Sequence, residues 1–298
     1  RSVVDAPPGK LWGRVVLQGT ARRLTNDDAR FELFPAWSPD GERIAYTTWS
    51  DDELGAVWTV RTNGRDRKKL TSRPGHYVEP SFSPDGRTVV YRRAGGDRLR
   101  GSYYSRETGI YRVAAEGGEP VLVTEAGSRP RFDAAGERIY LFAFENGKRA
   151  LVSVDLNGNH RQVHLISDNA TDLVPSPDER YVAIHERHHV HVAPFPKTGR
   201  TVTIGPNANE YPIARVSRDA GFNLHWSSDS RRLYWSLGPE LFHRDLVETF
   251  AFFDGADAAS LKAAPEAEGL YSGFRAESAK PEGAVALVGA RVITMRGD

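Results

Sequence analysis

The sequence predicts an all-β propeller of about five to six four-stranded blades. A strand–turn–strand motif recurs along the chain, and successive copies lie about 40–50 residues apart, which is the period of a propeller blade. The stretch between two copies holds two further short apolar segments. Each period therefore contains four candidate strands, and a chain of 298 residues has room for all the repeats.

The turn of the motif is clearest in residues 35–46, which read PAWSPDGERIAY. Proline presets the backbone angle of the turn, aspartate bonds nearby amides, and glycine takes the left-handed conformation that closes the hairpin. We interpret the turn residues as serving the backbone rather than catalysis. The serine or aspartate that opens the turn recurs at Ser38, Ser83, Asp133, Ser176 and Ser227.

The fourth and fifth copies carry Glu179 and Ser230 where the first three carry glycine. A left-handed residue other than glycine costs about 1–2 kcal/mol. These two turns are therefore expected to differ in geometry from the others.

The outer strands of each blade follow the motif. We expect third strands at residues 57–60, 110–113, 151–154 and 190–192, and fourth strands at 68–71, 121–124, 162–165 and 201–204. Second strands such as 139–142 are nearly continuous apolar runs, as expected for blades that are packed on both faces. Residues 11–25 copy 57–71 in length and ending. They predict the outer half of a further blade, whose inner half would lie before Arg1 or come from the far end of the chain.

Charge and composition exclude several classes of function. The chain has 40 basic and 39 acidic residues, a net charge of +1 and no cysteine. A balanced charge argues against a nucleic-acid partner, and the lack of cysteine excludes a disulfide framework, a zinc finger and a thiol nucleophile. We expect no membrane span, because no apolar run is long enough. No signal peptide is visible, and the start at Arg1 suggests an upstream segment that was removed or left out.

We divide the chain into a propeller at residues 1–246, a linker at 247–283 and the start of a further domain at 284–298. The linker is rich in alanine, glutamate, glycine and proline. The last segment reads as two short strands that have no counterpart in the repeat, so we expect it to be the first hairpin of another domain.

Two insertions break the repeat and supply candidate interface residues. Residues 92–108 hold Tyr103 and Tyr104 among several arginines, and both residue types are favoured at interfaces. The alternative is a solvated loop.

The second insertion, residues 209–221, holds Arg215, Arg218 and Asp219 just before the fifth inner strand. This position predicts that the cluster lies near the propeller axis or a rim, where it would contact another domain or line a substrate channel. The alternative is an internal pair between Asp219 and an arginine that braces the loop.

His189 and His191 project to the same face of a predicted strand. Imidazole suits zinc, so the two residues are a candidate metal pair. The sequence fixes no third ligand beside them, and histidines on the surface or between blades are the alternative. Residues 269–273 lack the spacing of a nucleophile elbow. No catalytic residue is assigned.

The repeated WSPDGxxIAY pattern resembles the WD40-like β-propeller repeats of the TolB family over residues 11–246. Residues 286–294, which read ALVGARVIT, resemble the opening strands of amidohydrolase-superfamily enzymes. Residues 214–227 also look like propellers that are fused ahead of such enzymes. The resemblance implies the N-terminal part of a TolB-like propeller–amidohydrolase.

The resemblance implies a non-catalytic scaffold, interaction surface or substrate gate for a C-terminal barrel. That barrel would use divalent metal, with zinc expected, to hydrolyse amide-like bonds. Its catalytic residues should lie beyond Asp298, so this chain should need no cofactor and be inactive alone. A bacterial, periplasmic or secreted protein is implied, and its oligomeric state stays open. Two alternatives remain: the propeller of a prolyl-oligopeptidase-like serine peptidase, and a free-standing TolB-like interaction module.

Overall fold

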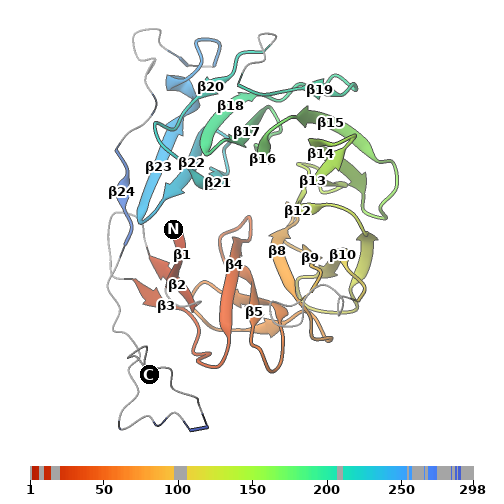
Figure 1. The fold of residues 1–298 in the computed structure, drawn as a ribbon, viewed down its shortest axis with the longest axis vertical. Coiled ribbons are helices and arrows are strands. Elements are labelled where there is room, and N and C mark those ends of the chain that lie inside the picture. The colour runs from red at the N-terminus through yellow and green to blue at the C-terminus, as the bar shows by residue number, and fades with distance from the viewer. Residues whose placement is uncertain are drawn as a thin grey trace, which may run out of the picture.

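The fold is all-β, and six small sheets surround a central opening (Figure 1). In this computed structural model the described residues are 2–6, 10–14, 21–96, 106–206, 211–253, 255–256, 265, 268–273, 283, 286 and 288–289. Five sheets contain four or five strands and one contains three. The predicted propeller of about five to six blades is confirmed.

The blades follow one another along the chain, and the first strand of each is the innermost (Figure 1). The first blade consists of β4 (Phe31–Trp37), β5 (Arg43–Trp49), β6 (Ala56–Arg61) and β7 (Lys68–Lys69). The second consists of β8 (Tyr77–Phe82), β9 (Thr88–Arg93), β10 (Gly109–Ala114) and β11 (Val121–Thr124). The third consists of β12 (Ser128–Phe132), β13 (Arg138–Glu145), β14 (Lys148–Asp155) and β15 (Gln162–Ser167), with β19 (Val202–Thr203) added at its outer edge.

The last two blades complete the repeat. The fourth consists of β16 (Ala170–Pro175), β17 (Tyr181–Glu186), β18 (His189–Pro194) and β20 (Ala214–Arg215). The fifth consists of β21 (Phe222–Trp226), β22 (Arg232–Leu237), β23 (Glu240–Asp245) and β24 (Leu270–Tyr271). A 3-10 turn, Leu246–Glu248, follows β23. Because β24 falls within residues 247–283, part of the predicted linker belongs to the propeller.

The N-terminal sheet confirms the predicted outer strands and adds one strand inside them. β2 (Lys10–Arg14) pairs with β3 (Arg22–Arg23), as the copy of the repeat predicts. The inner strand is β1 (Ser2–Ala6), which pairs antiparallel with β2. This sheet has three strands among the described residues, so β1 supplies one strand of the predicted inner half, and the other is not among them.

The outer edge of the fourth blade differs from the prediction. Residues 201–204 were expected to be its fourth strand, but β19 runs parallel to β15 in the third blade, where Val202 lies opposite Leu165. Ile204 follows β19 and is buried in the apolar cluster that also contains Leu165. The fourth position is taken by β20, which pairs with β18. The residue pattern predicts a strand but not the edge that receives it.

The apolar core lies between neighbouring blades. One cluster packs Val190 and Val192 of the fourth blade against Trp226 and Trp235 of the fifth. Another packs Val57 of the first blade together with residues of the second. Each blade therefore buries apolar residues against its neighbours, which explains why the second strands are apolar without clean alternation.

The turns confirm the backbone role of their serines and aspartates. In four of them the serine Oγ lies 2.5–2.6 Å from the aspartate Oδ1, in the pairs Ser38–Asp40, Ser83–Asp85, Ser176–Asp178 and Ser227–Asp229. The serine hydrogen bond lowers the pKa of Asp40, Asp85 and Asp229, and each of these carboxylates also accepts from a backbone N–H. Both groups are occupied within the turn.

The expected difference in turn geometry is wrong. Glu179 and Ser230 adopt φ of 56° and 61°, in the same left-handed region as Gly41 at 71°. The closing backbone hydrogen bond is also the same, since Glu179 N–H donates to Ser176 O and Ser230 N–H to Ser227 O. The repeat imposes the turn even where glycine is missing.

Candidate functional site

The inner strands, which border the central opening (Figure 1), are interrupted by β-bulges. Each bulge lies a few residues before the turn, and bulges re-aim side chains. Four residues before each turn serine or aspartate lie Phe34, Glu79, Arg129, Asp172 and Asn223, which we call the axial ring.

Backbone strain is concentrated in the axial ring. Phe34, Glu79, Arg129 and Asn223 have φ of 52–58°, in the left-handed region that favours glycine. Such a residue costs about 1–3 kcal/mol and persists where its surroundings fix it, most often at functional sites. The recurrence at one position of four blades marks the ring as the candidate functional site.

Charged side chains join the ring across three blades. Arg92 donates to Glu79 through Nε at 2.9 Å and Nη2 at 3.1 Å. Glu79 Oε2 also accepts from the Arg129 backbone N–H at 2.6 Å. The Arg129 guanidinium lies 3.1 Å from Asp172 Oδ1 and donates to the Thr171 carbonyl. Two guanidinium groups thus meet two carboxylates, so the charges of this network balance.

Polar and aromatic contacts extend the network to the fifth blade. Thr171 Oγ1 lies 2.6 Å from His185 Nδ1, and the His185 ring meets Phe222 edge-on at 5.3 Å. Burial lowers the pKa of His185, which keeps the imidazole neutral at pH 7. Asn223 Nδ2 donates to Ser236 Oγ at 2.9 Å. The central opening is therefore bordered by a continuous series of contacts from the second blade to the fifth.

Exposed aromatic rings lie along two inner strands: Phe31 and Phe222 begin β4 and β21, at the end remote from the turns, and Phe34 lies in the axial ring. Phe31 and Phe34 of β4 are 45% and 42% exposed, and Phe222 of β21 is 44% exposed. Exposed apolar groups that gather on one face commonly mark an interaction site. This end of the opening can take an apolar partner beside a charged but balanced ring.

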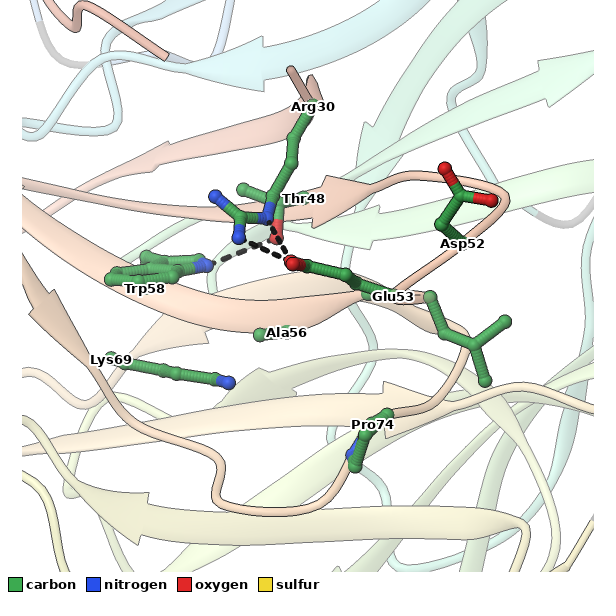
Figure 2. Close-up of a pocket in the computed structure, with 10 residues that line it drawn as sticks. Arg30, Thr48, Asp52, Glu53, Ala56, Trp58, Lys69 and Pro74 are labelled. Carbon is green, nitrogen blue, oxygen red and sulfur yellow. Dashed lines mark hydrogen bonds and ion pairs between the residues drawn. The ribbon is translucent and has the colours of Figure 1, made fainter.

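A separate pocket of about 470 Å³ lies at the first blade, where Trp58 and Lys69 form part of its wall. Figure 2 shows Glu53 pointing toward Arg30, with a hydrogen bond of 3.1 Å from Arg30 Nε. Trp58 Nε1 donates to Thr48 Oγ1 at 3.0 Å. These polar groups satisfy one another, so the pocket is a weaker candidate than the axial ring.

The predicted cluster at Arg215, Arg218 and Asp219 lies on the outer side of the fourth blade. Arg215 belongs to β20, the outermost strand of this blade, so of the two expected positions, the axis or a rim, it does not take the axial one. Its Nε donates to Ser217 O at 2.9 Å and its Nη2 to Arg218 O. Arg218 Nη2 lies 2.8 Å from Asp219 Oδ2. The internal pair that was the alternative is present, and the interface role stays a proposal.

The predicted metal pair is divided between two environments. His189 Nδ1 lies 2.7 Å from the Asp219 carbonyl, whereas His191 is only 6% exposed. Burial lowers the pKa of His191 to about 4. Among the described residues no group of three or more histidines, cysteines and carboxylates is placed to hold a metal ion. The pair has no third ligand there.

A serine–histidine pair outside the ring is structural. Ser153 Oγ lies 2.8 Å from His164 Nε2 and accepts a hydrogen bond from Arg138 Nε at 2.9 Å. Ser153 is fully buried, so no substrate reaches its hydroxyl.

Tyr103, Tyr104 and most of residues 284–298 fall outside the described residues. The axial ring was missed at the level of sequence. Its signal is positional, because Glu79, Arg129 and Asp172 occupy one column when the repeats are aligned on their turns. In the part of the chain that the structure describes, no helix reaches the length and apolarity needed to span a bilayer.

Comparison with known proteins identifies the repeat. A family profile described as PD40, TolB beta propeller domain, matches residues 15–191. A search of curated proteins gave no match. The chain is similar to the structure of TolB from Acinetobacter baumannii, with a TM-score of 0.57 and 16% identity over 76% of this chain. The match covers 54% of that protein, so the chain spans about half the length of this relative.

Two further structures share the fold. A nidogen/laminin complex has a TM-score of 0.57 and 11% identity, covering 80% of this chain and 86% of the other. An oligogalacturonate lyase from Vibrio parahaemolyticus has a TM-score of 0.52 and 9% identity, covering 76% and 68%. At these identities the likeness concerns the fold alone.

Proposed function

This chain belongs to the TolB beta propeller domain family, and from that premise we propose that it is a non-catalytic binding domain, which holds and gates a C-terminal metal-dependent amidohydrolase domain. The observation that carries the binding role is the axial ring, where strained residues of four blades surround one opening. The left-handed residue is kept at the bulge of four inner strands despite its cost, and this recurrence supports a role in binding.

The exposed rings of Phe31, Phe34 and Phe222 supply the docking face in this proposal. They lie along two inner strands, where an apolar surface of a second domain would cover them. The ion pairs of the axial ring, Arg92–Glu79 and Arg129–Asp172, would orient the second domain. Because their charges cancel, the second domain needs no net charge to bind there.

The amidohydrolase part of the proposal rests on the sequence of residues 286–294. In this reading the metal ligands lie beyond Asp298, and the bound divalent metal, zinc, would activate water for hydrolysis of an amide-like bond. A His-x-His within a few tens of residues after Asp298 is the expected signature. We also propose a bacterial location in the periplasm or outside the cell, which the resemblance to TolB-family propellers supports and with which the lack of cysteine is compatible.

An activity assay tests the non-catalytic role. Residues 1–298 purified alone are expected to hydrolyse neither amide nor ester substrates, with or without added zinc. Zinc-dependent turnover that disappears in a His189→Ala, His191→Ala variant would overturn the proposal and assign a metal site to the fourth blade.

A further inference from the structure

A second set of equivalent residues lies two positions closer to the turns than the axial ring. These residues pair with the third residue of the neighbouring strand in every blade, as in Arg131 opposite Tyr140 and His225 opposite Tyr234. The set consists of Ala36, Ser81, Arg131, Val174 and His225. Three members are small or apolar, so the charge of this level is carried by Arg131.

Among the described residues, Arg131 lacks the ion pair that Arg92 and Arg129 form. Arg92 is held by Glu79, and Arg129 by Asp172. Arg131 is partly exposed and makes no side-chain hydrogen bond or ion pair with any residue that the structure describes. Its guanidinium is therefore available to a ligand.

His225 occupies the equivalent position of the fifth blade. Its side chain is solvent-exposed and has no hydrogen-bond partner among the described residues. The surrounding protein, and next the positive charge of Arg131, lower the pKa of His225. The third and fifth blades are separated by the fourth, and Figure 1 shows β12 and β21 bordering the same opening. The charge of Arg131 therefore acts on His225, although the two residues belong to blades that are not adjacent.

The charge balance of the two levels determines what this site attracts. The axial ring and its partners are neutral as a set, because Glu79 and Asp172 offset Arg92 and Arg129. Arg131 adds a positive charge that no ion pair with a described residue offsets, and its partly buried side chain is screened less than a fully exposed one. A guanidinium offers a fork of donors that matches the two oxygens of a carboxylate or phosphate. A neutral imidazole adds one further donor.

We propose that Arg131 and His225 form a binding site in the central opening for a small oxyanion of the carboxylate or phosphate type. Ser81, at the same level, supplies a hydroxyl, and Ala36 leaves space for the ligand. The site goes beyond the domain-holding role and does not depend on it. An oxyanion bound there neutralises the one unpaired charge of this level.

Titration calorimetry at constant ionic strength tests the site in residues 1–298, with citrate and inorganic phosphate as probes and chloride as the background salt. Saturable binding of either probe is expected. Citrate binding alone assigns a carboxylate ligand, and phosphate binding alone a phosphoryl ligand. Arg131→Ala should weaken binding at least about tenfold, because a charge-assisted hydrogen bond is lost. Arg131→Lys should retain part of it, since the charge stays but the fork is lost.

Arg180→Ala is the matched control, because Arg180 is an exposed arginine in a turn and makes no side-chain contact with the described residues. Its affinity should equal that of the unchanged chain. If Arg131→Ala fails to fold, the imidazole resonances of His225 in the unchanged chain should still shift on addition of the probe. Absence of saturable binding, equal affinity in folded Arg131→Ala, or no response of His225 overturns the site.

Discussion

Ser230 Oγ accepts a hydrogen bond from the Asp178 backbone N–H at 2.9 Å, which links the turn of the fifth blade to that of the fourth. Ser230 is also one of the two residues that replace the turn glycine. Glu179, the other, accepts from the Ala134 N–H of the third blade at 3.2 Å. Each replacement therefore supplies an interblade hydrogen bond that glycine cannot make, which offsets its backbone strain.

Substitution of Ser230 separates these two contributions. Ser230→Ala keeps the left-handed strain and removes the acceptor of the Asp178 N–H in a part-buried hydrogen bond, so it should lower the free energy of unfolding by about 0.5–1.5 kcal/mol. Ser230→Gly loses the same bond but relieves the strain, and should cost about 1–2 kcal/mol less than alanine. Urea denaturation measures both. The exposed Ser228→Ala is the control, and equal stability of the alanine and glycine variants would contradict the account.

Removal of Glu79 tests the axial ring. Its carboxylate is 19% exposed and binds both the Arg92 guanidinium and the Arg129 N–H. Glu79→Ala leaves these donors unpaired and should destabilise the propeller by about 2–4 kcal/mol. Glu137→Ala, at an exposed turn, should stay within about 0.5 kcal/mol of the unchanged chain. A Glu79→Ala variant as stable as this control would show that the ring does not hold the blades together.

The buried imidazole of His191 should lower the free energy of unfolding in mild acid. Burial is the main reason why the pKa of His191 falls from the ordinary value of 6.5 to about 4 in the folded protein. Positive charge on His189, Arg215 and His185 lowers it further. Between these values the unfolded chain binds a proton that the folded chain does not, so stability rises with pH across this window. The contribution is complete above pH 6.5 and is lost as pH falls toward 4, a change of about 3 kcal/mol.

Denaturation midpoints measured from pH 7 to pH 4 test this dependence. His191→Gln should flatten the curve, whatever it does to stability at pH 7. His188→Asn is the matched control, because His188 is exposed and asparagine tolerates its left-handed φ of 74°. An unchanged slope in His191→Gln would show that other groups set the acid sensitivity.

The stability of the protein should depend more on Arg215 than on Arg218, the two arginines at the loop that follows β20. Arg215 donates to two carbonyls of the loop, so Arg215→Ala should cost about 1–2 kcal/mol. The Arg218–Asp219 pair is exposed on both sides, so Arg218→Ala should change stability by less than about 1 kcal/mol. A neutral Arg215→Ala that weakened the association with a second domain would instead support the interface role of this cluster.

The turns and second strands could be predicted from the sequence, because they depend on residues that are close together in the chain. Proline, aspartate and glycine at the turns define the hairpins, and the apolar runs beside them, such as that ending at Tyr46, become the second strands. The edge strands were less predictable. Val202 could pair with any free edge, and the burial of Ile204 beside Leu165 decided for the third blade.

The candidate site depends on contacts that the sequence separates widely. Arg129 meets Glu79 and Asp172 from strands of three different blades, so only the closed arrangement of the blades shows the network. Arg215 illustrates the opposite case. Its position before an inner strand suggested the axis or a rim, and the strand that contains it pairs at the outer edge of the fourth blade, away from the axis.

Hydrogen exchange tests the central claim most directly, by comparing residues 1–298 with a full-length protein that carries the proposed C-terminal domain. The account predicts slower exchange at residues 31–34 and 222–225 in the longer protein, because the second domain covers the exposed aromatic rings. The turns at residues 38–41 and 227–230, at the opposite end of the inner strands, should exchange equally in both. Equal exchange at both ends, or protection confined to the turns, would contradict the proposed docking face.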